Sequence, residues 1–137
     1  MKVLSFSSSL AVILLLLLSA CGSISQPDSL KGTAWKLTDI NDSPVLMNTS
    51  VTAEFSDGKV GGSSGCNSYG GAYTASGEKI TTDSIAMTLM ACMDPGVMEQ
   101  ESAFLEILQN AQTFEITEGQ LIIFSSDGKS LRFSQNP

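Results

Sequence analysis

The chain has 137 residues, a length that fits one domain with a modest core. It contains 7 basic and 14 acidic residues and no histidine, so its formal net charge at pH 7 is −7. This acidity argues against binding to nucleic acid, which rewards clustered lysine and arginine, and the lack of histidine excludes a Ser-His-Asp triad. The acidic residues are spread along the chain without a long run, which is typical of a solubilising surface.

The first twenty residues have the pattern of a secretory signal peptide. Lys2 supplies a positive charge at the start, and small residues end the apolar stretch. The apolar run from Leu10 to Leu18 has nine residues, whereas a membrane-spanning helix needs about 20. We therefore expect residues 1–20 to be a signal peptide that is removed on export.

The end of this leader resembles the lipobox of bacterial lipoproteins. Leu18-Ser19-Ala20-Cys21 matches that motif, and the resemblance implies that Cys21 becomes the first mature residue and carries acyl chains. Two or three such chains hold a protein firmly on a membrane, whereas one gives marginal binding. The alternative is an ordinary signal peptide in which Cys21 is incidental. In the lipoprotein interpretation, residues 21–29 form a lipidated polar tether, and residues 30–137 form the domain.

Gly22 and the mature charge indicate where an anchored chain resides. In lipoproteins of two-membraned bacteria, an aspartate after the cysteine often signals retention in the inner membrane, so Gly22 favours the outer membrane, facing the periplasm. Removing Lys2 from the 7 basic residues leaves 6 against 14 acidic ones, a net charge of −8. Anionic headgroups should repel such a surface, so we expect the N-terminal lipid to make the membrane contact.

The cysteine count agrees with export and a lipid anchor. Three cysteines are an odd number for an exported chain, where an unpaired thiol needs an explanation. Assigning Cys21 to lipid leaves Cys66 and Cys92, which can form a disulfide in an oxidising compartment. The competing interpretation is two buried free thiols packed as small apolar side chains.

From residue 30 onward the apolar residues mostly recur every second position, which predicts β-strands. The short Asp-Gly, Ser-Gly and Glu-Gly pairs between them predict turns, several of the hairpin kind. The predicted extended stretches are 35–40, 51–56, 59 onward, 72–74, 80–88, 113–117, 120–125 and 130–134. We expect an α+β fold that is mainly antiparallel β, with about seven or eight strands.

One segment, about residues 95–110, breaks this pattern and predicts a helix. Asp94 can cap it, and Pro95 fits the first helical position. Val97, Phe104 and Leu108 recur at spacings of three and four and form one apolar stripe. We expect this stripe to pack on the sheet and not to bind a ligand.

A glycine-rich stretch, GGSSGCNSYGGAY, occupies residues 61–73. Glycines within a strand often mark a bend or the close approach of another backbone, which would let a partner reach Cys66. The stretch also matches the hydrolase motif G-x-S-x-G around Ser63. That motif needs a following helix and a histidine, so we expect no hydrolase activity from Ser63.

Together these segments resemble the META domain, or HslJ-like, family of bacterial envelope proteins. The resemblance covers residue 30 to about residue 133, and it implies a compact, partly open antiparallel barrel with one helix. It supplies no catalytic residue, and many members carry a basic residue where Ser68 and Leu89 stand here, which weakens any anion-binding role. The matching motif residues are Trp35, Gly65, Cys66, Asn67, Gly70, Met87, Thr88, Met90, Cys92, Glu101 and Phe104.

We therefore expect a non-enzymatic, lipid-anchored module of the cell envelope with a structural, stress-related or protein-binding role. Its partners would be the membrane, through the lipid, and an unidentified envelope protein, and we expect no cofactor. The alternative is a periplasmic copper-handling protein, because soft thioethers suit Cu(I) and several methionines flank Cys92. They are Met87, Met90, Met93 and Met98. An enzyme is a third class, but no catalytic set is recognisable.

Overall fold

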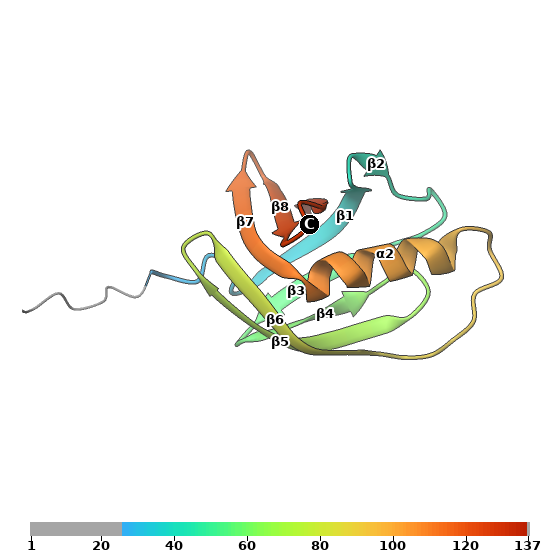
Figure 1. Cartoon of the computed structure of the whole chain (residues 1–137), viewed down its shortest axis with the longest axis horizontal. Helices are drawn as coiled ribbons and strands as arrows, with labels where there is room; N and C mark the ends of the chain where they lie inside the picture. The colour runs from blue at the N-terminus through green and yellow to red at the C-terminus, as the bar shows by residue number, and fades with distance from the viewer. Residues whose placement is uncertain (1–25, 137) are drawn as a thin grey trace, which may run out of the picture.

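Antiparallel strands that follow one another along the chain build the structure, a computed structural model that describes residues 26–136 (Figure 1). Eight strands form a barrel that closes where β1 pairs with β9. The short strand β2 pairs with the end of β1, at Asp39 and Ile40, beyond the part of β1 that pairs with β3. The elements are β1 Thr33–Ile40, β2 Ser43–Pro44, β3 Thr52–Ser56, β4 Lys59–Ser63, β5 Ser68–Ser76, β6 Lys79–Met87, α2 Val97–Gln109, β7 Ala111–Thr117, β8 Gln120–Ser125 and β9 Ser130–Gln135.

The strands form where the alternating pattern predicts them. On β1, Trp35 and Leu37 are buried and Lys36 between them is exposed. The β3–β4 turn places Asp57 and Gly58 at positive φ, and the β7–β8 turn does the same with the residues at 118 and 119. Two consecutive positive φ values are what a tight two-residue hairpin turn requires. The sequence prediction of strands and hairpins is confirmed.

The barrel is least continuous between β6 and β7. These strands share a single residue pair, Lys79 with Thr113, whereas every other neighbouring pair in the barrel shares at least three. Helix α2, which joins β6 to β7 in the chain, packs where they diverge, and Thr82 Oγ1 donates a 2.8 Å hydrogen bond to Leu108 O. The predicted antiparallel barrel with a helix is confirmed. It is closed and not partly open, its least continuous seam lies between β6 and β7, and α2 is the one helix among residues 26–136.

The helix begins later than the sequence predicts. Val97 is its first residue, and Gly96, with φ of +81°, precedes it without any side-chain cap. The helix predicted at about residues 95–110 is confirmed, but the predictions that Asp94 caps it and that Pro95 occupies its first helical position are wrong. The left-handed backbone at Gly96 turns the chain between Pro95 and the helix, and a residue with a Cβ adopts this conformation with difficulty. Asp94 contacts the start of the helix only through its backbone oxygen, which accepts a hydrogen bond from Val97 N at 3.3 Å.

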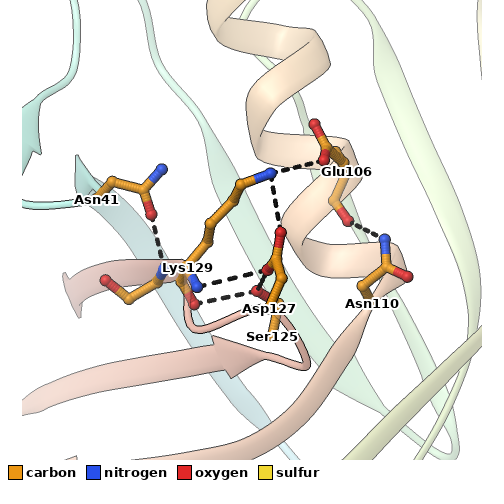
Figure 2. A network of polar contacts seen from close by, with 7 residues as sticks. Asn41, Glu106, Asn110, Ser125, Asp127 and Lys129 are labelled. Carbon is orange, nitrogen blue, oxygen red and sulfur yellow. Dashed lines mark hydrogen bonds and ion pairs between the residues drawn. The ribbon is translucent and has the colours of Figure 1, made fainter.

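A polar network holds the other end of α2 to the β8–β9 turn (Figure 2). Lys129 Nζ lies 2.7 Å from Glu106 Oε1 on the helix and 3.0 Å from Asp127 Oδ2 in the turn. The Ser125 hydroxyl and then Lys129 stabilise the Asp127 carboxylate, and together they lower its pKa to about 2. The charged side chains of Glu106, Asp127 and Lys129 are at least partly exposed, so solvent screens the ion pairs, which orient the turn more than they stabilise the fold.

The described chain starts at the β5–β6 turn. A Cβ placed on Gly77 in that turn would collide with the Gln26 side chain. Asp28, inside the expected tether, accepts hydrogen bonds from Leu30 N at 2.9 Å and Tyr73 Oη at 2.7 Å. The expected leader and Cys21 lie outside the described residues, and within them no helix is long and apolar enough to cross a membrane.

Strand β6 carries the chain from this turn to the other end of the molecule. It has nine residues, which span roughly 26 Å at about 3.3 Å per residue. Residues 88–96 follow as a loop without strand or helix, here called the 88–96 loop. In Figure 1 this loop lies at the right, and the first described residues lie at the left.

Candidate functional site

The carboxylate of Glu101 is buried where α2 faces the connection between β4 and β5. Glu101 as a whole residue is only 1% exposed to solvent. Oε2 accepts hydrogen bonds from Ser64 Oγ at 2.5 Å and from Asn67 N at 2.8 Å, and Oε1 accepts one from Asn67 Nδ2 at 2.8 Å. The helix carboxylate therefore holds both the backbone and the side chain of Asn67.

Asn67 passes this constraint on to the 88–96 loop. Its Oδ1 accepts hydrogen bonds from Met90 N at 2.7 Å and Thr88 Oγ1 at 2.9 Å. Its Nδ2 also donates to Met90 O at 3.2 Å. One buried amide thus engages both backbone groups of Met90, much as a neighbouring strand would.

A disulfide makes a second connection to the same loop. Cys66 and Cys92 are bonded, with their Cα atoms 5.9 Å apart, which lies within the usual range for a bridge. The predicted Cys66–Cys92 disulfide is confirmed, and the alternative that both thiols are free is wrong. Because Cys66 and Asn67 are adjacent, two neighbouring residues hold the loop at positions 92 and 90.

Glycine allows the β4–β5 connection to reach this position. Gly65 has φ of +107°, a conformation that other residues rarely adopt. A Cβ on Gly62 would lie 2.5 Å from Thr52 O, so the backbones of β3 and β4 approach too closely for a side chain there. The predicted bend and close approach in the glycine-rich stretch are confirmed.

Hydrogen bonds alone stabilise the charge on Glu101. Burial by itself would raise the pKa of this carboxyl group, but the bonds from Ser64 and Asn67 outweigh it, so the pKa lies below its ordinary value of 4.5. Among residues 26–136 no basic side chain forms an ion pair with it. An ionised carboxylate with such partners is suited to holding backbone in place.

Two contributors to this site carry no signal in the sequence. Gln100 Oε1 accepts a hydrogen bond from Leu46 N at 2.7 Å, and its Nε2 donates to Thr49 Oγ1 at 2.9 Å, so α2 also holds the loop after β2. Ser64 is the second, and its role depends on a helix residue 37 positions later. Gln100 belongs to no recognisable motif, and Ser64 lies in the glycine-rich stretch but at no spacing that points to Glu101.

The motif residues divide into two groups. One group builds the wall and core. Trp35 and Phe104 are buried, and Phe104 packs edge-on to Tyr69 with ring centroids 5.3 Å apart. Gly70 pairs with Gly61 across β4 and β5, and Met87 packs against the core. The other group forms the site around the 88–96 loop. It comprises Gly65, Cys66, Asn67, Thr88, Met90, Cys92 and Glu101.

The four methionines considered for copper do not share one environment. Met87 packs against the core, whereas Met90, Met93 and Met98 are exposed. The sulfur of Cys92 is bonded to Cys66 and offers no thiolate. Within residues 26–136 no group of three or more histidine, cysteine or acidic side chains is placed to hold a metal ion. No structural observation therefore favours the copper function.

Ser63 lacks the surroundings of a hydrolase nucleophile. It ends β4, and the chain continues through a bend into β5 and not into a helix. Its hydroxyl accepts a hydrogen bond from Gly65 N at 3.2 Å. The G-x-S-x-G match is therefore a glycine-rich bend between strands.

Replacing Glu101 by glutamine should destabilise the protein by about 2–4 kcal/mol at pH 7, because an NH₂ group would then face donors of Ser64 or Asn67. The folded pKa of Glu101 is lowered, so its contribution is complete above pH 4.5 and is lost as the pH falls through the folded pKa. The difference between wild type and variant, measured by urea unfolding, should therefore shrink below about pH 4.5. Glu115→Gln, on the exposed surface of β7, is the matched control, with an expected change under about 0.5 kcal/mol. Equal stability of wild type and Glu101→Gln at pH 7 would contradict this account.

Removing the disulfide with the double substitution Cys66→Ala and Cys92→Ala should lower the free energy of unfolding by about 3.5 kcal/mol. The bridge closes a loop of 27 residues, counted from 66 to 92, and so restricts the unfolded chain. Urea unfolding with and without a reducing agent measures the effect. The reductant should destabilise the wild type and leave the double variant unchanged; equal sensitivity of both would refute the assignment.

Comparison with known proteins agrees with this architecture. A protein structure determined by NMR is 25% identical, with a TM-score of 0.63 over 77% of this chain and 90% of the other. A second NMR structure, of a protein from Burkholderia xenovorans, is 26% identical, with a TM-score of 0.62 over 78% of this chain and 83% of the other.

A crystal structure of a DUF4847 family protein from Bacteroides vulgatus ATCC 8482 has a TM-score of 0.57. It covers 79% of this chain and 95% of the other, but at 16% identity it shares only the fold. A search among curated proteins gives no match. The model of the META domain family matches residues 28–137, which confirms the resemblance found in the sequence. The chain belongs to the META domain family.

Proposed function

We propose that this META domain protein is a non-enzymatic module, anchored to the cell envelope by lipid on Cys21, that presents the 88–96 loop to an envelope protein. One observation carries the proposal. The loop is fixed by the Cys66–Cys92 bridge and by Asn67, yet it holds large apolar side chains in solvent.

The cysteines support export and the anchor. Cys66 and Cys92 are bonded to each other, and such bonds persist in oxidising compartments outside the cytosol. Cys21 is then the remaining cysteine, and it follows an apolar run at the end of a lipobox-like motif. Gly22 next to it favours the outer membrane, with the domain facing the periplasm.

The polar groups of the site support a role without catalysis. Both oxygens of Glu101 accept hydrogen bonds from Ser64 and Asn67, so this carboxylate is engaged in holding structure. A general base must instead reach a proton on the substrate. The sequence also contains no histidine.

The exposed side chains of the loop support docking of a protein. Leu89 is 89% exposed and Met93 is 92% exposed, although both are apolar. Exposed apolar groups gathered on one segment are typical of interaction sites. Because the backbone at Met90 and Cys92 is already fixed, a partner would order little chain on binding, and this lowers the entropic cost of association. Holding a partner is also what a structural or stress-related envelope role requires.

A photo-reactive amino acid at position 93 should cross-link an envelope protein in living cells. The same residue at position 116 is the matched control, because Ile116 is also an exposed apolar side chain but lies on β7, near the β7–β8 turn. In fractionated cells the cross-linked product should remain with membranes after a high-salt wash. Cys21→Ala should release the chain from that fraction.

Two results would contradict the proposal. The first is an identical set of cross-linked products from positions 93 and 116, which would remove the role of the loop. The second is Cys21→Ala remaining with the washed membranes while mass spectrometry finds no lipid on the wild type, which would remove the anchor.

A further inference from the structure

The segment between Lys79 and Lys129, which contains the 88–96 loop, has eight acidic but no basic residues. Of its acids, Glu101 is buried, and Glu106 and Asp127 pair with Lys129. The rest of the mature chain has six acidic and six basic residues, so it is neutral overall. Asp94 in the loop and Glu99 in the first turn of α2 are both exposed.

Apolar side chains accompany these acidic groups on the same short stretch. Leu89, Met90 and Met93 project from the loop, and Met98 follows in the first turn of α2. Methionine is unbranched and adapts its shape to irregular apolar partners. The surface therefore combines an adaptable apolar area with carboxylates and contains no basic residue.

We propose that the 88–96 loop and the first turn of α2 dock a cationic amphipathic segment of a partner protein. The inference rests on the proposed function and adds the chemistry of the partner. Leu89 and Met93 meet the apolar face of the segment, and Asp94 and Glu99 meet its lysine or arginine side chains. Such pairing of apolar and charged groups sets both the affinity and the choice of partner.

The charge of the loop favours a protein over the anchoring membrane. The loop leaves the end of β6 opposite the β5–β6 turn, where the first described residues meet the domain. Its exposed carboxylates repel anionic headgroups, whereas they attract the lysine or arginine side chains of a cationic segment.

The test measures binding of defined fluorescent peptides to the full chain in zwitterionic nanodiscs, with empty nanodiscs subtracted. One peptide of about 18 residues contains leucine and lysine, with leucines recurring at three and four. A second replaces every lysine by glutamate, and a third scrambles the first so that it has no apolar face. Only the leucine–lysine peptide should bind, and its affinity should fall as the salt concentration rises.

Two pairs of variants separate the apolar contribution from the charged one. Leu89→Ser with Met93→Ser should weaken binding by about tenfold or more, and Ile116→Ser should leave it unchanged. Asp94→Asn with Glu99→Gln should weaken binding and flatten its salt dependence. Glu115→Gln with Glu118→Gln makes the same change of charge at the β7–β8 turn, and it should have little effect.

The outcomes distinguish this inference from the function on which it rests. Three results would overturn the proposal of a cationic segment. They are equal binding by the variant with Leu89→Ser and Met93→Ser, equal binding of the glutamate peptide, and adsorption to empty nanodiscs alone. Position-specific cross-linking from residue 93 would still stand in those cases, and the partner would then have another chemistry. Loss of that cross-linking overturns the proposed function itself.

Discussion

The burial of one ionised carboxylate constrains the whole end of the barrel that carries the 88–96 loop. A charge removed from water must receive hydrogen bonds, or the fold loses several kcal/mol. Glu101 receives them from Ser64 and Asn67, which can reach it only because the chain bends inward after β4. That bend uses the positive φ of Gly65 and brings Cys66 to Cys92. Helix position, strand connection and disulfide thus depend on the same requirement.

The consequence is an apolar loop that is ordered without being buried. Loops usually keep their large apolar residues by packing them against a core, but here the backbone of Met90 is held by the amide of Asn67 and the side chains face solvent. Hydrogen bonds and a covalent bond therefore fix the backbone of the loop, and its apolar side chains stay available for contact with another molecule. This arrangement connects the buried carboxylate of Glu101 to the proposed docking role.

Much of the fold was predictable because local rules determine it. Alternation on strands such as β1 and the turn at Asp57 and Gly58 report burial and backbone preference within a few residues. The start of α2 was not predictable, because Asp94 and Pro95 carry good helix-start signals while Gly96 sets the actual boundary. The disulfide followed from counting cysteines. To predict where the helix starts, the backbone path of the whole loop would have to be known.

The site was only partly predictable, for a different reason. Family motifs named Asn67 and Glu101, but their contacts join residues 34 positions apart, and only the folded barrel brings these together. Gln100 belongs to no motif at all.

The most direct test of the account is amide hydrogen exchange at Met90 in the oxidised protein. Exchange should be at least about 100-fold slower than in an unfolded chain, and Glu101→Gln should accelerate it. Exchange at the unfolded rate in the wild type would contradict the claim that Asn67 and Glu101 hold the loop.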